Sequence, residues 1–116
     1  MFRFTGPLKV YLATGVTDLR KSFSGLWALA AVQMKEDPQN GGLFVFCNRR
    51  RNRVKLLYCE STGVWVMTKR LDEGTFSWPK GVEVEDGKLS LTPEALGLLL
   101  DGVDLKDGSL RPWYQR

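Results

Sequence analysis

The spacing of apolar residues changes along the chain and predicts where helices and strands lie. Between residues 17 and 35, apolar side chains recur every three to four positions, which is typical of one face of an amphipathic helix. We therefore predict a long helix over about 17–35, capped by Thr17 or Asp18 and ending before Asp37. Gly25 in its interior predicts a close packing contact. The apolar stripe consists of Leu19, Phe23, Leu26, Trp27, Ala30 and Met34.

The period becomes two from residue 43 to residue 78. Three runs, LFVFC, RVKLLYCE and VWVMTKRL, are separated by turn-forming clusters and predict a three-stranded antiparallel meander. LFVF is apolar on both faces, so we expect the first of these strands to be central and covered. LKVYL (8–12) predicts an earlier strand, TFSW (75–78) a short edge segment, and VEVEDGKLSL a hairpin that turns at Asp86-Gly87.

A second, short helix is predicted over about 93–101, with Thr92 as its cap and Pro93 at its first position. Its leucines cover a broad face, so it could pack on its own sheet or on a neighbouring molecule. The predicted fold class is α+β, an antiparallel meander or curled sheet packed with one long helix and one short C-terminal helix. We expect a single domain over 1–116, with an ordered core over about 8–105 and a loosely held tail over 106–116.

Composition and cysteine content agree with a small globular domain. The chain has 116 residues, 43% of them hydrophobic, which is enough to form a core without disulfide or metal staples. No apolar run is long enough to span a membrane, and the start resembles no signal peptide, so we expect a cytoplasmic protein. Cys47 and Cys59 lie in apolar runs and are expected to be reduced, with a disulfide between neighbouring strands as the less favoured alternative.

The absence of histidine from the sequence excludes several kinds of chemistry. Ser-His-Asp and Cys-His catalysis need an imidazole, and with two cysteines and no histidine one chain cannot build a usual zinc site. No Gly-rich phosphate loop occurs. A carboxylate metal site would draw on Asp18 and Glu60, whereas the other acidic residues cluster in turns. We expect a protein that is not an enzyme and needs no cofactor or metal.

Charge is distributed unevenly between the two parts of the chain. Residues 1–70 carry twelve Lys or Arg against four Asp or Glu, a balance of +8, whereas residues 71–116 carry five against nine, a balance of −4. Such asymmetry suggests a surface that faces a polyanion. It would also fit self-association, in which the acidic part of one copy meets the basic part of another.

The densest basic stretch falls in the turn between the first two meander strands, where five cations occupy seven positions from Arg49 to Lys55. A β-ribbon with arginines at its tip can enter a DNA groove or straddle phosphates. Arg20 and Lys21, expected in the first helical turn, would add a phosphate seat beside free N–H groups. A solvated, aggregation-resistant turn is the alternative. The predicted nucleic-acid-binding residues are Arg20, Lys21, Arg49, Arg50, Arg51, Arg53, Lys55, Lys69 and Arg70.

Four aromatic residues could serve either of two roles. Rings near a basic surface can stack on unpaired bases, but they more often belong to a core or to a partner interface. The four are Tyr58, Trp65, Phe76 and Trp78.

Three blocks of the sequence resemble a known family. They are VYLATGVTDLRKSFSGL, LFVFCNRRRNRVKLLYCESTGVWVMTKRLDEGTFSWP and LSLTPEALGLLLDGVD. Together they are similar to the small TnpB-type accessory proteins of insertion-sequence family sixty-six, which are distinct from the RNA-guided nucleases of that name. The resemblance covers about 8–105 and departs from the usual pattern at Ser22, Ser24 and the tail after Val103. It implies an accessory role in transposition beside a DDE-type transposase, and it assigns no catalytic residue.

Two hypotheses of different classes follow. In the first, the protein is an accessory subunit of DNA transposition that binds DNA through its basic hairpin. In the second, it is an adaptor that binds the cognate transposase, or another protein of the element, without touching DNA. Salt dependence separates the two, because charge-driven binding to DNA weakens steeply as salt rises.

Overall fold

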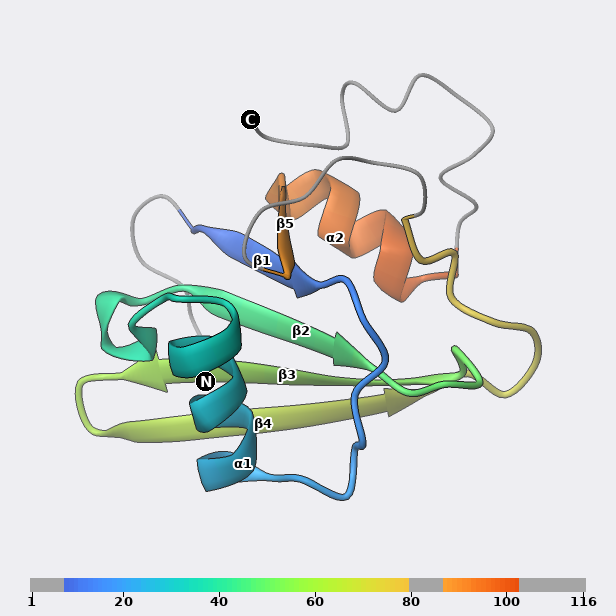
Figure 1. The fold of residues 1–116 in the computed structure, drawn as a ribbon. Helices are drawn as coiled ribbons and strands as arrows, with labels where there is room; N and C mark the ends of the chain where they lie inside the picture. Colours follow the sequence, from blue (N-terminus) through green and yellow to red (C-terminus); the bar gives the residue numbers. More distant parts are fainter. Residues whose placement is uncertain (1–7, 80–86, 103–116) are drawn as a thin grey trace.

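The fold is a five-stranded sheet with helices on both faces. The computed structural model describes residues 8–79 and 87–102. The strands are β1 (Val10–Ala13), β2 (Leu43–Cys47), β3 (Arg53–Glu60), β4 (Gly63–Arg70) and β5 (Lys88–Leu91), in the order β4-β3-β2-β1-β5. The helices are α1 (Phe23–Ala28), which continues as η1 (Leu29–Gln33), the short η2 (Pro38–Asn40) and α2 (Pro93–Leu100). Figure 1 shows their arrangement.

The α+β class and the meander are confirmed. β2, β3 and β4 pair antiparallel in sequence order, and β2 is central, with all five of its residues buried. The sheet is mixed rather than wholly antiparallel, because β1 pairs parallel with β2 and the chain crosses between them through α1 and η1. β5 pairs antiparallel with β1, while residues 82–85, the predicted first arm of its hairpin, lie outside the described residues.

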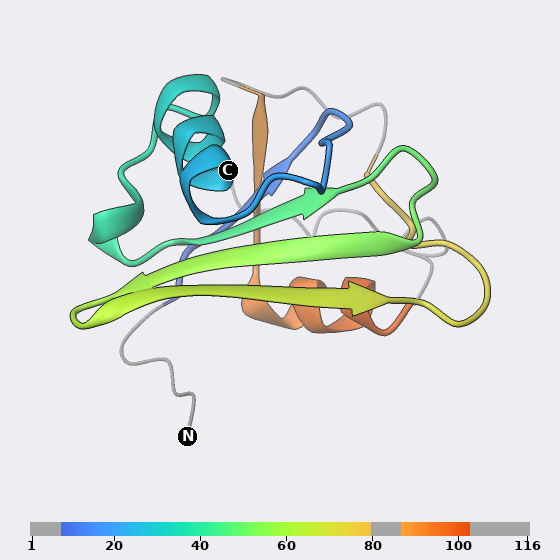
Figure 2. The ribbon, with the colours of Figure 1, turned by 90° about the horizontal axis from the view of Figure 1, so that it is seen from below.

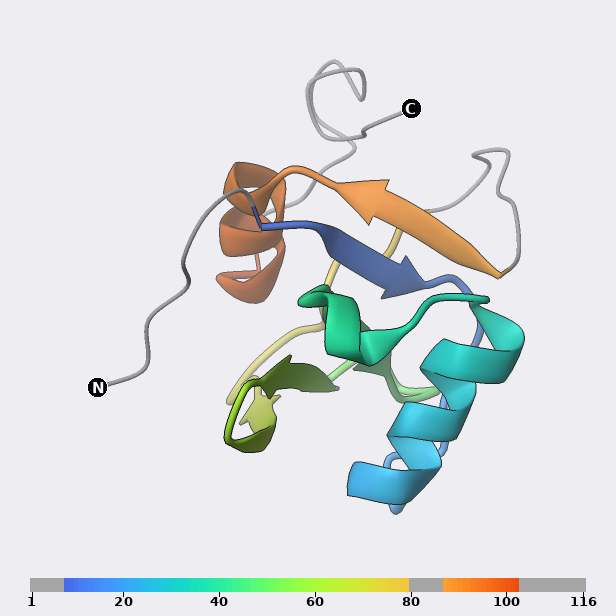
Figure 3. The ribbon, with the colours of Figure 1, turned by 90° about the vertical axis from the view of Figure 1, so that its left-hand side faces the viewer.

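Alternation along the strands separates two cores, one on each face of the sheet. Leu26 and Ala30 of the helix pack with Phe44, Phe46 and Leu57 on one face. On the other face Ala95, Leu96 and Leu99 of α2 pack with a second set of strand residues. Figures 2 and 3 show α1 and α2 on opposite sides of the sheet. The second helix therefore packs on its own sheet. We call the two sides the α1 face and the α2 face.

The long helix begins later than predicted. Its N-cap is Ser22, not Thr17 or Asp18, and no side chain caps it. Thr17 is buried, and its N–H donates to Cys47 O at 2.9 Å, while the Asp18 carboxylate accepts the Arg20 N–H at 3.0 Å. These bonds give the backbone N–H groups of this segment partners outside a helix. Asp side chains typically compete with helix formation in this way.

The helix also ends differently from the prediction. In η1, Met34 N–H donates to Leu29 O, five residues back, at 3.0 Å. Lys35 then takes a positive φ of 54°, a left-handed conformation that stops the helix. Gly25 does sit in close contact as predicted, since a Cβ built there would lie 3.0 Å from Lys21 Cβ.

The segment TFSW forms no strand among the described residues, so the predicted edge strand is wrong. Phe76 N–H donates to Arg51 O at 2.6 Å, and Trp78 Nε1 donates to Ala13 O at 3.0 Å. Both rings are buried on the α2 face. The gain from burying two large rings exceeds that of a short edge pairing. The C-terminal helix agrees well with its prediction, since the Thr92 side chain accepts the Ala95 N–H at 3.1 Å.

Candidate nucleic-acid interface

The basic turn between β2 and β3 is held by one asparagine. Asn48 Oδ1 accepts the N–H groups of Asn52 and Arg53, both at 3.1 Å, and its Nδ2 donates to Asn52 Oδ1 at 2.7 Å. The Asn48 side chain thus closes the turn by accepting N–H groups that would otherwise need backbone partners. Arg49 and Arg50 are exposed at its tip. The turn therefore presents two arginines from a fixed backbone.

Arg51, the third arginine of the run, points elsewhere. It has a left-handed φ of 57°, and its guanidinium carbon lies 5.2 Å from the centroid of the buried Trp78 ring. Its Nη1 is buried and donates no hydrogen bond among the described residues. A guanidinium over an indole face makes a cation–π contact. In this arrangement the charge of Arg51 packs against the core, and its contact with phosphate stays a prediction that the packing does not favour.

Three cations gather on the α1 face where β3 begins and β4 ends. Arg53 lies directly opposite Arg70 in the β3–β4 register, and Lys55 lies opposite Thr68. Alternation puts these residues on the same face as Leu57, which packs against the helix. We call Arg53, Lys55, Thr68 and Arg70 the basic block. Arg53 and Arg70 are exposed, and within the described part of the chain neither forms an ion pair.

The loop before α1 joins this block. Lys55 Nζ donates to Lys21 O at 3.0 Å, which holds the start of the helix against β3. In Figure 1 the segment between β1 and α1 runs past the end of the sheet where β3 begins. Arg20 and Lys21 precede the helix instead of forming its first turn, so the predicted phosphate seat at helix N–H groups is not formed there. Lys21 nevertheless adds an exposed ammonium beside the block.

Arg20 is engaged by a neighbour in the same loop. Its Nη2 lies 2.7 Å from Asp18 Oδ2, and its Nε also bonds that carboxylate. Hydrogen bonds from the Arg20 side chain and backbone lower the pKa of Asp18 to about 2. Both side chains are exposed, so a phosphate could exchange with the carboxylate.

Lys69 does not extend the basic block. It alternates to the α2 face, where its Nζ donates to Leu100 O at 2.6 Å and lies 3.9 Å from Asp101 Oδ1. A cation at the last carbonyls of α2 stabilises that helix end. Lys69 therefore has a structural role, whereas its neighbour Arg70 belongs to the basic block.

Three of the four predicted stacking residues are buried on the α2 face: Tyr58 (8% exposed), Phe76 (2%) and Trp78 (3%). Of the two alternatives left open for these three residues, their burial favours a place in the core over stacking on bases. Trp65 remains exposed, at 42%, and its Nε1 donates to Glu60 Oε1 at 2.9 Å. Sequence reasoning missed Phe23, which it placed on the core stripe but which is 54% exposed. Its position in the first helical turn could have indicated this exposure, because a helix end can extend beyond the sheet that the helix covers.

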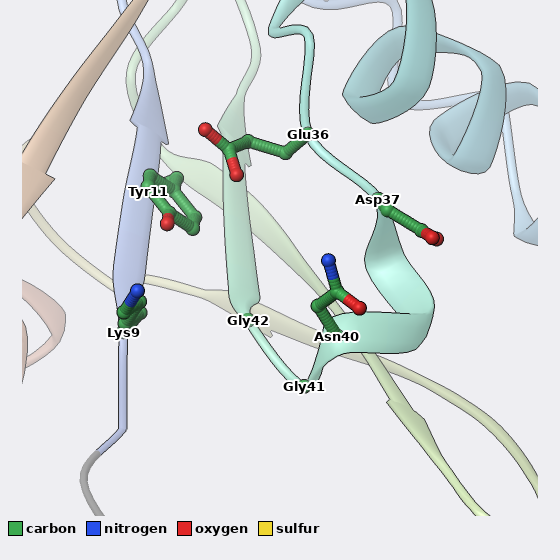
Figure 4. A pocket seen from close by; sticks show the side chains of 7 residues that line it. All are labelled: Lys9, Tyr11, Glu36, Asp37, Asn40, Gly41 and Gly42. Atoms are coloured by element: carbon green, nitrogen blue, oxygen red, sulfur yellow. The ribbon is translucent and has the colours of Figure 1, made fainter.

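A pocket of about 150 Å³ lies at the other end of the sheet, before β1 and β2 (Figure 4). Its charged groups are largely engaged with their neighbours. Glu36 forms an ion pair with Lys88, whose Nζ also donates to Met34 O at 2.8 Å, and Asp37 Oδ1 accepts the Gln39 N–H at 2.9 Å. Burial and the carboxylate of Glu36 raise the pKa of Tyr11 above its ordinary value. The pocket is lined by Lys9, Tyr11, Glu36, Asp37, Asn40, Gly41 and Gly42.

The two cysteines and the possible metal ligands of the described residues form no further site. Cys47 is buried and Cys59 half-buried, and both are free thiols, as expected. Burial raises the pKa of the Cys47 thiol, an effect that the guanidinium of Arg51 partly opposes. Among residues 8–79 and 87–102, no three His, Cys, Asp or Glu side chains gather in a way that could hold a metal ion. No helix in this part of the chain is long and apolar enough to cross a membrane.

Comparison with known proteins places the chain in a family. Residues 8–109 match the model of the IS66 Orf2 like proteins. The uncharacterized protein y4hO of Sinorhizobium fredii is 37% identical over 97 residues, covering 84% of this chain and 82% of that protein. The uncharacterized protein y4jC of the same organism is 36% identical over 97 residues, covering 84% and 80%. No solved structure matches the chain. The chain belongs to the IS66 Orf2-like family of transposition-associated accessory proteins.

Proposed function

We propose that the protein is a non-enzymatic accessory factor of transposition that acts in the cytoplasm by binding DNA through its basic block and basic turn. The observation that carries this proposal is the pairing of Arg53 with Arg70 across β3 and β4. Like charges directly opposite each other destabilise a sheet. A bound phosphate would remove that cost and use both guanidinium groups as donors.

The surrounding residues extend the surface beyond one phosphate. Arg49 and Arg50 project from the turn that leads into β3, and Lys21 is held beside the block by the bond from Lys55. These cations come from three separate segments at one end of the sheet. Such a surface supports contact with several phosphates along a nucleic-acid backbone, which fixes position without reading sequence.

Fluorescence anisotropy of labelled duplex DNA, at two salt concentrations, tests the proposal. Arg70→Ala should weaken binding and reduce the steepness of the salt dependence by about one phosphate contact. Lys9→Ala is the matched control, since it removes one exposed cation at the opposite end of the sheet. Equal affinity for Arg70→Ala and the unaltered protein would refute the proposal. The affinity for DNA of the element ends, compared with that for scrambled DNA, would show whether the site distinguishes sequence.

A second candidate function is an adaptor that binds the transposase, and Trp65 favours it. The indole is 42% exposed and oriented by its bond to Glu60, on the face opposite the basic block. Exposed tryptophans are enriched at protein interfaces. If this function holds, Trp65→Ala should abolish co-purification with the transposase after nuclease treatment, and the association should be insensitive to salt.

A further inference from the structure

Phe23 is an aromatic residue whose ring is exposed instead of packed in the core. It begins α1 and is 54% exposed, whereas Leu26 and Ala30, three and seven residues later, are fully buried against the sheet. Residues at these intervals share one face of a helix. Phe23 therefore lies on the sheet-facing side of α1, but in the first turn, where the sheet no longer covers it.

The position of Phe23 relative to the cations follows from the chain. Lys55 Nζ bonds Lys21 O at 3.0 Å, so Lys21 is fixed beside the basic block. Phe23 is two residues further on, and two residues span at most about 7 Å. α1 covers the same face on which Arg53 and Arg70 lie. An exposed aromatic ring and a group of cations thus lie near each other on one face of the sheet.

Rings and cations in this combination are the arrangement by which proteins hold single-stranded nucleic acid. The cations contact the phosphates, and the ring stacks on a base. In a regular duplex both faces of each internal base are covered by neighbouring pairs, so a ring stacks at lower cost on a base that is unpaired. Among the described residues the exposed rings are Phe23 and Trp65, and Trp65 lies on the α2 face, so Phe23 is the exposed ring on the face of the basic block.

We infer that Phe23 stacks on an unpaired base of single-stranded DNA whose phosphates lie on the basic block. This inference rests on the proposed function, because it uses the same cations, and it adds a preference for unpaired DNA. It also assigns a role to a residue that the amphipathic pattern placed in the core.

The experiment measures the affinity of the protein for a short labelled single strand and for the duplex of the same sequence. Phe23→Ala should weaken single-strand binding at least about fivefold, since a stacked base contributes that much or more. Duplex binding should change less than about twofold, because phosphate contacts dominate it. Phe23→Trp should restore single-strand binding. Trp65→Ala, an aromatic deletion on the other face, should alter neither affinity. Circular dichroism and thermal unfolding should show that each variant is folded.

The inference is overturned if Phe23→Ala leaves single-strand binding unchanged, or weakens single-strand and duplex binding equally. Loss of binding in Arg53→Ala/Arg70→Ala with no change in Phe23→Ala would preserve the proposed function and remove only the stacking role. Unchanged binding in Arg53→Ala/Arg70→Ala would remove the proposed function itself. The two failures are therefore distinguishable.

Discussion

Arg53 and Arg70 face each other across the antiparallel pair β3–β4, and each is exposed on the α1 face. Opposed like charges cost a sheet about 0.2–1 kcal/mol, and no carboxylate ion pair offsets that cost within the described residues. A position that is unfavourable for stability and favourable for an anion is typical of a binding site.

Stability and DNA binding should therefore respond in opposite directions at this pair. Arg53→Ala should leave the free energy of unfolding unchanged or raise it by up to about 1 kcal/mol at low salt, because the repulsion is relieved. Adding Arg70→Ala should give little further gain, since the repulsion is already gone. Urea unfolding at low and high salt checks this. A clear loss of stability in Arg53→Ala would contradict it.

The turn that presents Arg49 and Arg50 should depend on Asn48. Asn48→Ala removes the acceptor of the Asn52 and Arg53 N–H groups, and it should lower the free energy of unfolding by about 1–3 kcal/mol. Asn40→Ala, at an exposed asparagine of another turn, is the control and should cost less than about 1 kcal/mol. Equal losses in the two variants would show that the Asn48 bonds are not what holds the turn.

Alkaline pH should destabilise the fold through Tyr11. Burial, followed by the charge and hydrogen bond of Glu36, raises the pKa of Tyr11 above its ordinary value of 10.0. The folded state thus retains a proton that the unfolded state releases first. The stabilisation is fully present below pH 10.0 and is lost as the pH rises through the folded-state pKa. Thermal unfolding from pH 8 to pH 11 should show the decline, and Tyr11→Phe should lessen it. The same decline in both proteins would assign it to other groups.

The two thiols should differ in reactivity. Cys47 is completely buried, and burial raises its pKa, whereas Cys59 is half-buried with its Sγ 3.6 Å from Glu60 O. Because the thiolate is the reactive form, iodoacetamide should modify Cys59 first in the folded protein and both thiols equally in denaturant. Mass spectrometry of peptides checks the order, with Cys59→Ser as the control that should leave the native protein nearly unmodified. Faster modification of Cys47 would contradict its burial.

The Asp18–Arg20 pair should be measurable directly. Arg20 lowers the pKa of the Asp18 carboxyl from 3.8 to about 2, so its NMR titration midpoint should move back up in Arg20→Gln. The direction of the shift means that any stability from this pair is present above pH 3.8 and is lost as the pH falls through about 2. An unchanged midpoint in Arg20→Gln would show that another group holds the carboxylate.

Elements with strong local periodicity could be predicted from the sequence. The meander strands are apolar or alternating runs of five to eight residues, and Thr92 with Pro93 marks the start of α2, so backbone and packing preferences agree there. The start of α1 could not be predicted in this way. The Asp18 carboxylate accepts the Arg20 N–H, and the Thr17 N–H donates to the carbonyl of Cys47, a residue 30 positions further along the chain. A bond to a distant strand is invisible to local propensity.

The sequence by itself determined the composition of the candidate interface, a basic N-terminal part with an arginine-rich turn, and the α+β pattern of helix and strand periods. Only the tertiary structure decided which cations lie together. The register sets Arg53 against Arg70, alternation sends Lys69 to the α2 face, and core packing draws Arg51 over Trp78. It also buried three rings and exposed Phe23. Charge is a property of each residue, but its direction depends on strand register and on the packing of both faces, which arise only when the sheet assembles.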